Sequence, residues 1–193
     1  MKVESGRLES TLGTPATVLG LEGEQTLKLE ERVTQLFDEL HVPVYRYLLY
    51  LTMSPTETDE IIQETFLRLY QHLNSGGNER NLRGWIFRVA HNLCINELKS
   101  RKRVARASED SPELDVSVAD SRPGPEELLL HREKIARIHA AVSSLSEQQK
   151  QCLLLRAEGF RYREIAEILE VTISTVAESL RRAIKKLTKE SDG

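Results

Sequence analysis

The sequence contains little cysteine, and the arrangement of its metal-binding residue types points to no cofactor. Cys94 and Cys152 are its two cysteines, and each lies within an apolar helical pattern. They predict buried thiols in a reducing compartment, with a redox switch as the alternative. The five histidines never form an H-E-x-x-H pair, and the cysteines form no cluster. We therefore expect no metal ion and no cofactor.

Motifs of common enzymes and of membrane insertion are also missing. The chain has neither a G-x-x-x-x-G-K-[ST] phosphate loop nor a G-x-S-x-G elbow, so no catalytic residue and no enzyme are expected. No apolar run approaches the roughly 20 residues that span a bilayer, and no secretory segment begins the chain. These absences predict a cytoplasmic protein without membrane contact. The formal net charge of −3 argues against an obligate nucleic-acid coat protein, but it leaves room for local basic surfaces.

The residues that are abundant favour an all-α protein. Leucine, glutamate, arginine and alanine dominate the 193 residues, and aromatic residues make up 5%. We expect two small helical bundles joined by a flexible acidic linker, the C-terminal one containing a helix-turn-helix. The linker is rich in acids, serine and proline and cannot bury enough apolar surface to fold. The expected ranges are a flexible N-terminal extension over 1–25, a first bundle over 26–106, the linker over 107–125 and a second bundle over 126–190.

Two helices begin the first bundle. A helical pattern from Thr26 to Thr52 is expected to break or kink at Pro43. The run Ser54-Pro55-Thr56-Glu57 predicts the next helix start, with serine as the cap, proline in the first position and glutamate completing a capping box. The loop Asn74–Asn78 is expected to be mobile. The predicted outer face of this second helix carries Asp59, Glu60, Gln63, Glu64 and Arg68.

A third predicted helix, Leu82 to about Arg103, is strongly basic. Between Arg80 and Arg106 there are eight Lys or Arg and one acid, Glu97, a local charge of about +7. Such segregation in an acidic chain is an electrostatic signature of nucleic-acid binding. The alternative is a solvated helix end, where cations also interact favourably with the helix dipole.

The second bundle is expected to contain a helix-turn-helix. Tyr162–Leu169 forms one helix, and Thr172 is the predicted N-cap of the next, with Ala166 at the close crossing against Val176. The predicted inner face of the last helix is Ile173, Val176, Leu180, Ile184 and Leu187. Its basic outer face suits the major groove of DNA, although an ordinary surface helical hairpin is the alternative. The outer residues are Ser174, Thr175, Ala177, Glu178, Arg181, Arg182 and Lys185.

These residues resemble the extracytoplasmic-function (ECF) sigma factors of bacterial RNA polymerase. The family has a C-terminal pattern of three elements: L-P-x-x-x-R, then E-G-x-S-Y-x-E-I-A-x-x-L-G, then G-T-V-K-S-R-L-x-R-A. The residues of this chain that match the pattern are Leu145, Lys150, Glu158, Gly159, Tyr162, Glu164, Ile165, Ala166, Leu169, Thr175, Val176, Leu180, Arg182 and Ala183. Ser146 stands where the family has proline, and Glu170 where the turn has glycine. Ala177, Glu178 and Ser179 replace the lysine, serine and arginine that usually face DNA.

The N-terminal half resembles the same family independently. Asp59 or Glu60, Gln63 and Phe66 fit its D-x-x-Q-x-x-F pattern. Its W-L-x-x-I-A-x-N-x-x-x-D pattern is matched by Trp85, Ala90 and Asn92, with Asn96 replacing the aspartate. The resemblance implies a detachable subunit that recognises promoters for core RNA polymerase and has no chemistry of its own. A free-standing helix-turn-helix regulator and a protein-interaction module are the alternatives.

The resemblance also assigns sites and partners. Core RNA polymerase would be contacted at its clamp and flap regions, with Asp59, Glu60, Gln63 and Glu64 meeting the clamp. The −10 element would be bound by Arg88, Asn92, Asn96, Lys99, Arg101 and Lys102, beside a pocket formed by the Asn74–Arg80 loop. The −35 element would be bound by Ser174, Thr175, Ala177, Glu178, Arg181, Arg182 and Lys185. Because Glu178 departs from the family pattern and a carboxylate can accept from a cytosine amino group, we expect a cytosine near Glu178 in a −35 element that differs from the family's common one. An anti-sigma factor is a further candidate partner.

Overall fold

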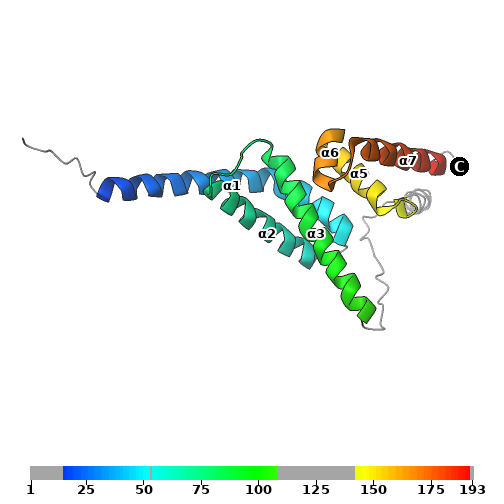
Figure 1. The fold of residues 1–193 in the computed structure, drawn as a ribbon, viewed down its shortest axis with the longest axis horizontal. Helices are drawn as coiled ribbons and strands as arrows, with labels where there is room; N and C mark the ends of the chain where they lie inside the picture. Colours follow the sequence, from blue (N-terminus) through cyan, green and yellow to red (C-terminus); the bar gives the residue numbers. More distant parts are fainter. Residues whose placement is uncertain (1–14, 53, 108–141, 192–193) are drawn as a thin grey trace, which may run out of the picture.

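The computed structural model describes residues 15–52, 54–107 and 142–191. Throughout this part of the chain the regular structure is helical, which confirms the predicted all-α class (Figure 1). The N-terminal unit consists of α1 (Pro15–Thr52), α2 (Pro55–Asn74) and α3 (Leu82–Ala107). The C-terminal unit consists of α5 (Glu147–Ala157), α6 (Tyr162–Leu169) and α7 (Ile173–Ser191). None of the described helices is long and apolar enough to cross a membrane.

Helix α1 ends at Thr52 as predicted, but it differs from the prediction at its N-terminal end and at Pro43. It begins at Pro15, so the expectation of a flexible extension is wrong for residues 15–25, whereas residues 1–14 lie outside the described part. It also continues through Pro43, where a break or a kink was expected, so the break does not occur. An interior proline costs about 3 kcal/mol in a helix. Apolar burial on both sides of Pro43 offsets this cost, because Leu36, Leu40, Val44, Tyr47 and Leu48 are all buried.

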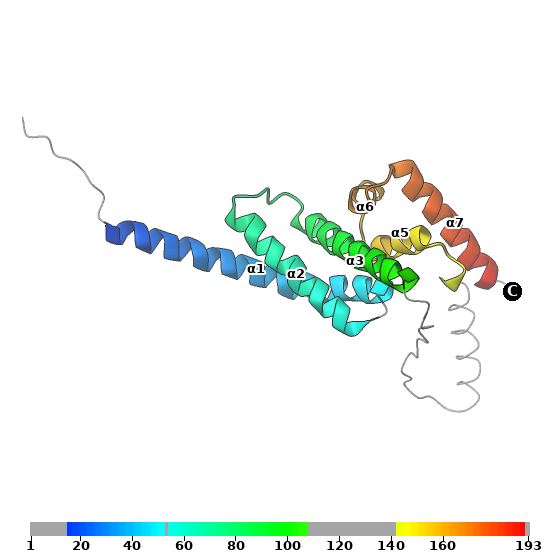
Figure 2. The same cartoon turned by 60° about the horizontal axis from the view of Figure 1, so that its bottom comes forward.

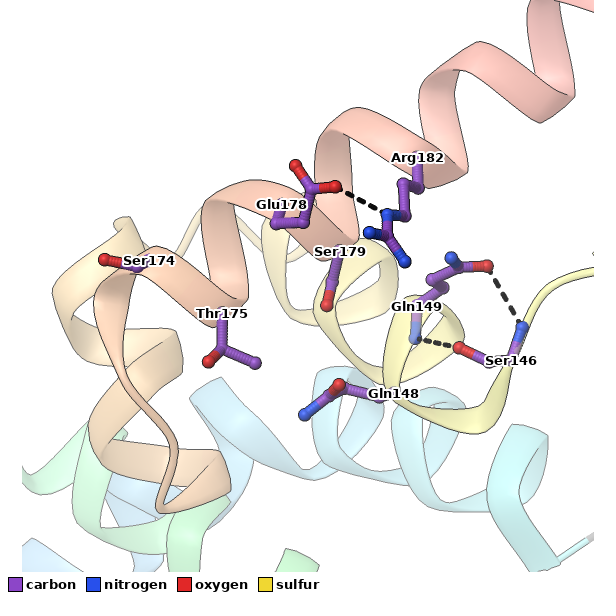
Figure 3. A pocket seen from close by; sticks show the side chains of 8 residues that line it. All are labelled: Ser146, Gln148, Gln149, Ser174, Thr175, Glu178, Ser179 and Arg182. Atoms are coloured by element: carbon purple, nitrogen blue, oxygen red, sulfur yellow. Dashed lines mark hydrogen bonds and ion pairs between the residues drawn. The ribbon is translucent and has the colours of Figure 1, made fainter.

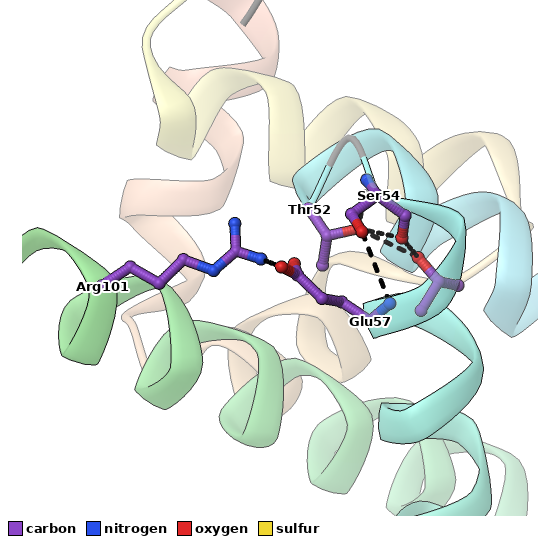
Figure 4. A network of polar contacts seen from close by, with 5 residues as sticks. Thr52, Ser54, Glu57 and Arg101 are labelled. Carbon is purple, nitrogen blue, oxygen red and sulfur yellow. Dashed lines mark hydrogen bonds and ion pairs between the residues drawn. The ribbon is translucent and has the colours of Figure 1, made fainter. Parts of the chain in front are cut away.

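The start of α2 forms only half of the predicted capping box (Figure 4). The Ser54 hydroxyl accepts a hydrogen bond from the Glu57 backbone N–H at 3.4 Å, as expected. The Glu57 carboxylate does not return to Ser54; it pairs instead with Arg101 of α3. The Ser54 backbone N–H is satisfied by the Thr52 hydroxyl at 3.2 Å. The helix cap is thereby connected to a distant helix by an ion pair.

The core of the N-terminal unit lies between α1, α2 and α3. Helix α2 contributes Ile61, Ile62, Phe66 and Leu69, and α3 contributes Leu82, Ile86, Phe87, Ala90 and Cys94. Phe37 of α1 meets Phe66 edge-on, with ring centroids 4.9 Å apart. The outer side of α2 is left free of apolar packing, as its periodicity predicts.

The C-terminal unit confirms the predicted cap of α7 and corrects its predicted inner face. The Thr172 hydroxyl accepts a hydrogen bond from the Thr175 N–H at 3.1 Å. Ile173 and Ile184 are each 52% exposed, although both were assigned to the inner face. The buried stripe runs instead through Val176, Ser179, Leu180 and Ala183, because the contact face of α7 is centred one residue away from the predicted one. The linker and most of the helix expected from Glu126 lie outside the described residues.

A buried polar pair links α1 and α3. The Tyr47 hydroxyl and the His91 Nδ1 are 2.8 Å apart and form a hydrogen bond. Burial lowers the pKa of His91 from 6.5 to about 4, and burial also raises the pKa of Tyr47. Both groups are therefore neutral at pH 7. The charge on Glu170 favours the protonated form of His91 and the charge on Lys99 opposes it, but desolvation outweighs both.

This pair predicts a loss of stability in mild acid. The unfolded chain binds a proton on His91 near pH 6.5, whereas the folded chain does so only near pH 4. The free energy of unfolding should therefore fall as the pH drops through this window, by up to roughly 3 kcal/mol. Urea unfolding of the parent protein and of His91→Gln at several pH values tests this prediction. Equal pH dependence in the two proteins would contradict it.

Candidate nucleic-acid interface

The outer face of α2 presents a polar and acidic surface. Asp59, Glu60 and Gln63 are exposed, and Glu64 is half-buried beside Arg68, with which it forms an ion pair at 2.7 Å. The opposite side of the helix packs into the core of the N-terminal unit. These four predicted residues therefore lie together on the side of α2 that faces away from the core.

Helix α3 carries a polar stripe on the side away from its core residues. Arg88, Asn92, Asn96 and Lys99 follow one another at spacings of four, four and three and share one face of the helix. Arg88, Asn96 and Lys99 are exposed, whereas Asn92 is half-buried and donates to Glu170 of the C-terminal unit at 3.2 Å. Lys102 continues the exposed polar surface toward the end of the helix.

Arg101 is not part of this stripe. Its half-buried guanidinium forms the ion pair with Glu57 at the start of α2 (Figure 4). The structure thus gives Arg101 a partner inside the N-terminal unit, and its charge is balanced there. Sequence reasoning missed this pairing because Glu57 fitted a local capping box and Arg101 fitted a basic cluster.

A hollow of about 290 Å³ lies beside the stripe, at the loop between α2 and α3. The expected pocket loop contributes Asn78 and Arg80, and α3 contributes Arg88. Sequence reasoning missed the other lining residues. These are His72, Asn81, Gly84, Trp85, Glu164, Glu167 and Ile168. Trp85 and the nearby His72, close to the end of α2, were the signal that could have indicated an aromatic wall.

The loop around the hollow is held by specific contacts, although a mobile loop was expected. His72 stacks on Trp85 with ring centroids 4.7 Å apart, and its Nε2 lies 3.1 Å from the Asn78 carbonyl oxygen. The Arg80 N–H donates to the Asn78 side chain at 2.9 Å. Asn81, with a positive φ of 55°, accepts from the Gly84 N–H at 3.1 Å and caps α3. The hollow is therefore walled by an ordered aromatic pair and by polar loop groups.

The N-terminal half of α7 borders a second hollow, of about 390 Å³, against the start of α5 (Figure 3). Ser174 is exposed and Thr175 is half-buried at its rim, while Arg181, Arg182 and Lys185 are exposed further along α7. Ala177 and Glu178 are half-buried. The lining residues are Ser146, Gln148, Gln149, Ser174, Thr175, Glu178, Ser179 and Arg182. All seven predicted residues of α7 therefore remain at least partly accessible.

Glu178 is bound to its own helix. Its carboxylate accepts from Arg181 at 2.8 Å and 2.7 Å and from Arg182 at 2.5 Å. Hydrogen bonds from Arg181 and Arg182 lower its pKa to about 2 (Figure 3 shows the bond to Arg182). The carboxylate is therefore ionised at neutral pH, and it partly balances two cations that face solvent.

Ser179 corrects one interpretation of the family pattern. It was treated as a position facing DNA, yet it is only 7% exposed, and its side chain partly offsets the rise that burial causes in the pKa of Cys152. A serine there completes the packing of α7 against α5. The position is consequently part of the interior rather than of the candidate interface.

Glu170 occupies the turn between α6 and α7 in the left-handed region, with φ 54° and ψ 43°. The family glycine that it replaces would adopt this conformation without strain, whereas a residue with a Cβ costs about 1 kcal/mol more. Its side chain accepts the hydrogen bond from Asn92. The departure from the family pattern therefore adds a contact between the two units that glycine could not make.

The two cysteines lie in the core, as predicted. Burial raises the pKa of Cys94 to about 12 and also raises the pKa of Cys152. Because the thiolate is the reactive form, this environment disfavours the alternative of a redox switch. Among the residues that the structure describes, no three His, Cys, Asp or Glu side chains are grouped so that they could hold a metal ion.

Comparison with known proteins identifies the two units. Residues 36–104 match the family described as Sigma-70 region 2, and residues 135–187 match Sigma-70, region 4. The chain is 23% identical over 166 residues to the ECF RNA polymerase sigma factor SigX of Bacillus subtilis, covering 85% of this chain and 86% of the relative. It is 28% identical over 155 residues to the ECF RNA polymerase sigma factor SigL of Mycobacterium tuberculosis, covering 79% and 84%.

Two solved structures share the fold. The sigma factor RpoE in complex with the anti-sigma factor NepR, from Bartonella quintana, has a TM-score of 0.62 at 20% identity and covers 82% of this chain and 97% of that one. CnrH in complex with the cytosolic domain of CnrY has a TM-score of 0.57 at 20% identity and covers 86% and 94%. Both similarities concern the fold alone.

The two matched regions show that the chain is a sigma factor of the sigma-70 family. Within that family the chain belongs to the ECF sigma factors. Its function is accordingly to direct RNA polymerase to promoters, and it is not a free-standing helix-turn-helix regulator.

Proposed function

We propose that three described surfaces of this sigma factor each bind a different partner in promoter recognition. The outer face of α2 binds the clamp of core polymerase. The stripe on α3 and the adjoining hollow bind the −10 element, and the outer face of α7 binds the −35 element. The observation that carries this proposal is the line of Arg88, Asn96 and Lys99 along α3, beside a hollow walled by His72 and Trp85.

This arrangement suits the capture of a separated DNA strand. Exposed cations spaced along one helix face can follow consecutive phosphates, and an unstacked base needs a pocket with a flat wall. The stripe supplies the cations, and the hollow supplies polar groups from Asn78 and Arg80. Arg101 contributes less than the other predicted residues of this site, because its charge is already paired with Glu57.

The proposal for α7 is a helix in the major groove. Ser174 and Thr175 at its N-terminal end are placed to reach base edges, and Arg182 and Lys185 lie further back, where cations meet phosphates. Three hydrogen bonds from Arg181 and Arg182 leave one acceptor position on Glu178 Oε2, which can accept from a cytosine amino group.

In this proposal the protein performs no chemistry of its own and works in the cytoplasm, where core polymerase and promoter DNA are found. An anti-sigma factor is proposed as a further partner. Two similar folds are of sigma factors in complexes, one with the anti-sigma factor NepR and one with the cytosolic domain of CnrY. Reporter activity in a host that carries or lacks the neighbouring genes tests this partner, and equal activity in both would argue against it.

Transcription assays with purified components test the main proposal. Core polymerase with this protein should melt and transcribe a target promoter, whereas either component alone should not. Arg88→Ala and Lys99→Ala should weaken permanganate reactivity at the start site, and each should reduce the salt dependence of opening by about one phosphate contact. Arg32→Ala, at an exposed arginine on α1, is the matched control. If both variants gave the same permanganate footprints as the parent, the stripe on α3 would not be the site that captures the separated strand.

The outer face of α2 is tested by a binding assay. Gln63→Ala combined with Glu64→Arg should weaken core polymerase affinity by roughly tenfold, because a charge is reversed at the centre of the contact. Both positions are at the surface, so stability should change by only about 0.5 kcal/mol. Gln35→Ala with Glu39→Arg makes the same two changes on the exposed side of α1. Equal core affinity of the two double variants would remove the assignment.

The role of Glu178 is tested by selection from randomised −35 DNA. Glu178→Gln should change the preferred base at one position, because a good contact to a base edge discriminates against the wrong base by about 1–3 kcal/mol. Arg182→Ala should weaken binding to all sequences alike. Glu147→Gln, at an exposed glutamate of α5, is the control. If the parent and Glu178→Gln enrich the same motif, the carboxylate serves only to hold Arg181 and Arg182.

A further inference from the structure

Helix α7 carries an exposed apolar edge outside the core of the C-terminal unit. The helix lies on the outer side of this unit, beyond α5 and α6 as seen from the N-terminal unit (Figures 1 and 2). Ile173 and Ile184 are each 52% exposed, and Ala177 between them is half-buried. Residues that are four and seven positions apart lie on one side of an α-helix. These three residues therefore form a single apolar edge.

The apolar edge borders the face that we propose to bind the −35 element. Ser174 and Glu178 each directly follow a residue of the edge, which places them about 100° further around the helix. Ile173 is the first residue of α7, and the N-terminal residues of a recognition helix are those that reach base edges in the major groove. Ile184 lies on the same edge but about 16 Å further along the helix, where cations meet phosphates. The N-terminal part of the apolar edge is thus placed to contact a base.

The polar groups at the start of α7 are directed to other partners. The hydroxyl groups of Thr172 and Thr175 are 2.8 Å apart and bonded to each other, and Thr172 also accepts from the Thr175 N–H. Arg181, one turn after Ala177, is held by two hydrogen bonds to Glu178. Ala177 itself has a methyl group where the family pattern has a lysine. The apolar edge therefore offers only methyl and methylene groups to a base.

Thymine is the base that an apolar side chain can recognise in the major groove. It presents a C5 methyl group there, whereas the other groups that distinguish the four bases are hydrogen-bond donors and acceptors. An isoleucine side chain excludes water from a methyl group, and this burial is favourable. It offers nothing to a donor or an acceptor, which would lose its water without compensation. The apolar edge consequently favours thymine over cytosine at the position that it contacts.

We propose that Ile173, together with Ala177, determines specificity at the −35 element by contacting the methyl group of a thymine. This thymine lies beside the base that Glu178 contacts, because Ala177 and Glu178 are consecutive residues. The inference rests on the proposed function, in which α7 lies in the major groove of the −35 element. It adds a residue to that surface that periodicity had assigned to the inner face of α7.

Replacement of thymine by uracil tests this contact, because uracil lacks the C5 methyl group and pairs with adenine in the same way. Holoenzyme formed from core polymerase and this protein is titrated with promoter DNA that carries uracil at each thymine of the −35 element in turn. At the contacted position the affinity of the parent should fall roughly three- to fivefold, the effect of about one buried methyl group. Uracil at thymines outside the −35 element is the control on the DNA side.

Variants of α7 assign the effect to one side chain. Ile173→Ala should weaken binding to thymine DNA and abolish the difference between thymine and uracil, whereas Ile173→Val should retain most of this difference. Ile184→Ala removes an equally exposed isoleucine of the same edge and should leave the difference at its parental value. Both isoleucines are at the surface, so the variants should fold, which circular dichroism checks.

Two outcomes would overturn the thymine contact by itself. Uracil could weaken binding equally in the parent and in Ile173→Ala, or it could have no effect at any −35 position in the parent. Scrambling the whole −35 element tests the proposed function separately. If scrambling leaves the affinity of the parent unchanged, the proposed role of α7 fails and the thymine contact fails with it.

Discussion

Burial of the apolar face of α3 is the constraint on which the rest of the structure depends. Ile86 and Ala90 pack into the bundle with α1 and α2, and Phe87 extends the same core to Phe160 of the C-terminal unit. Helix α3 therefore buries apolar side chains against two partners, the N-terminal bundle and the C-terminal unit. Its remaining side carries Arg88, Asn96 and Lys99, which are free for a third. Folding, the contact between the units and the proposed binding of DNA thus all use the same helix.

The sequence predicts the helices well because their signals are local. Apolar spacing located α2 and α3, and the Ser54 and Thr172 caps have their predicted hydrogen bonds. The exposure of Asp59, Glu60 and Gln63 also follows from periodicity alone. The helix does not break at Pro43 because the local cost of proline is outweighed by burial along both halves of α1, which depends on contacts with other helices.

The parts that could not be predicted depend on pairs that are distant in sequence. Glu57 and Arg101 were assigned to two different roles, and only the packing of α2 against α3 brings them together. Asn92 was expected to contact DNA, yet here it meets Glu170, a residue noted only as a departure from glycine. Ser179 is buried because the contact face of α7 is offset by one residue. Sequence patterns give the approximate face of each helix, but they do not give its partner.

The association of Glu178 with Arg181 and Arg182 has a consequence for the ions around DNA. A bound protein releases roughly one condensed counterion for each phosphate that its cations neutralise. Two arginines that share one carboxylate carry the net charge of a single cation. The middle of α7 therefore displaces fewer counterions than its arginine count suggests. In the proposed binding of α7 to the −35 region, affinity therefore depends less on ionic strength, and a larger share of the binding energy comes from the fit of side chains to base edges.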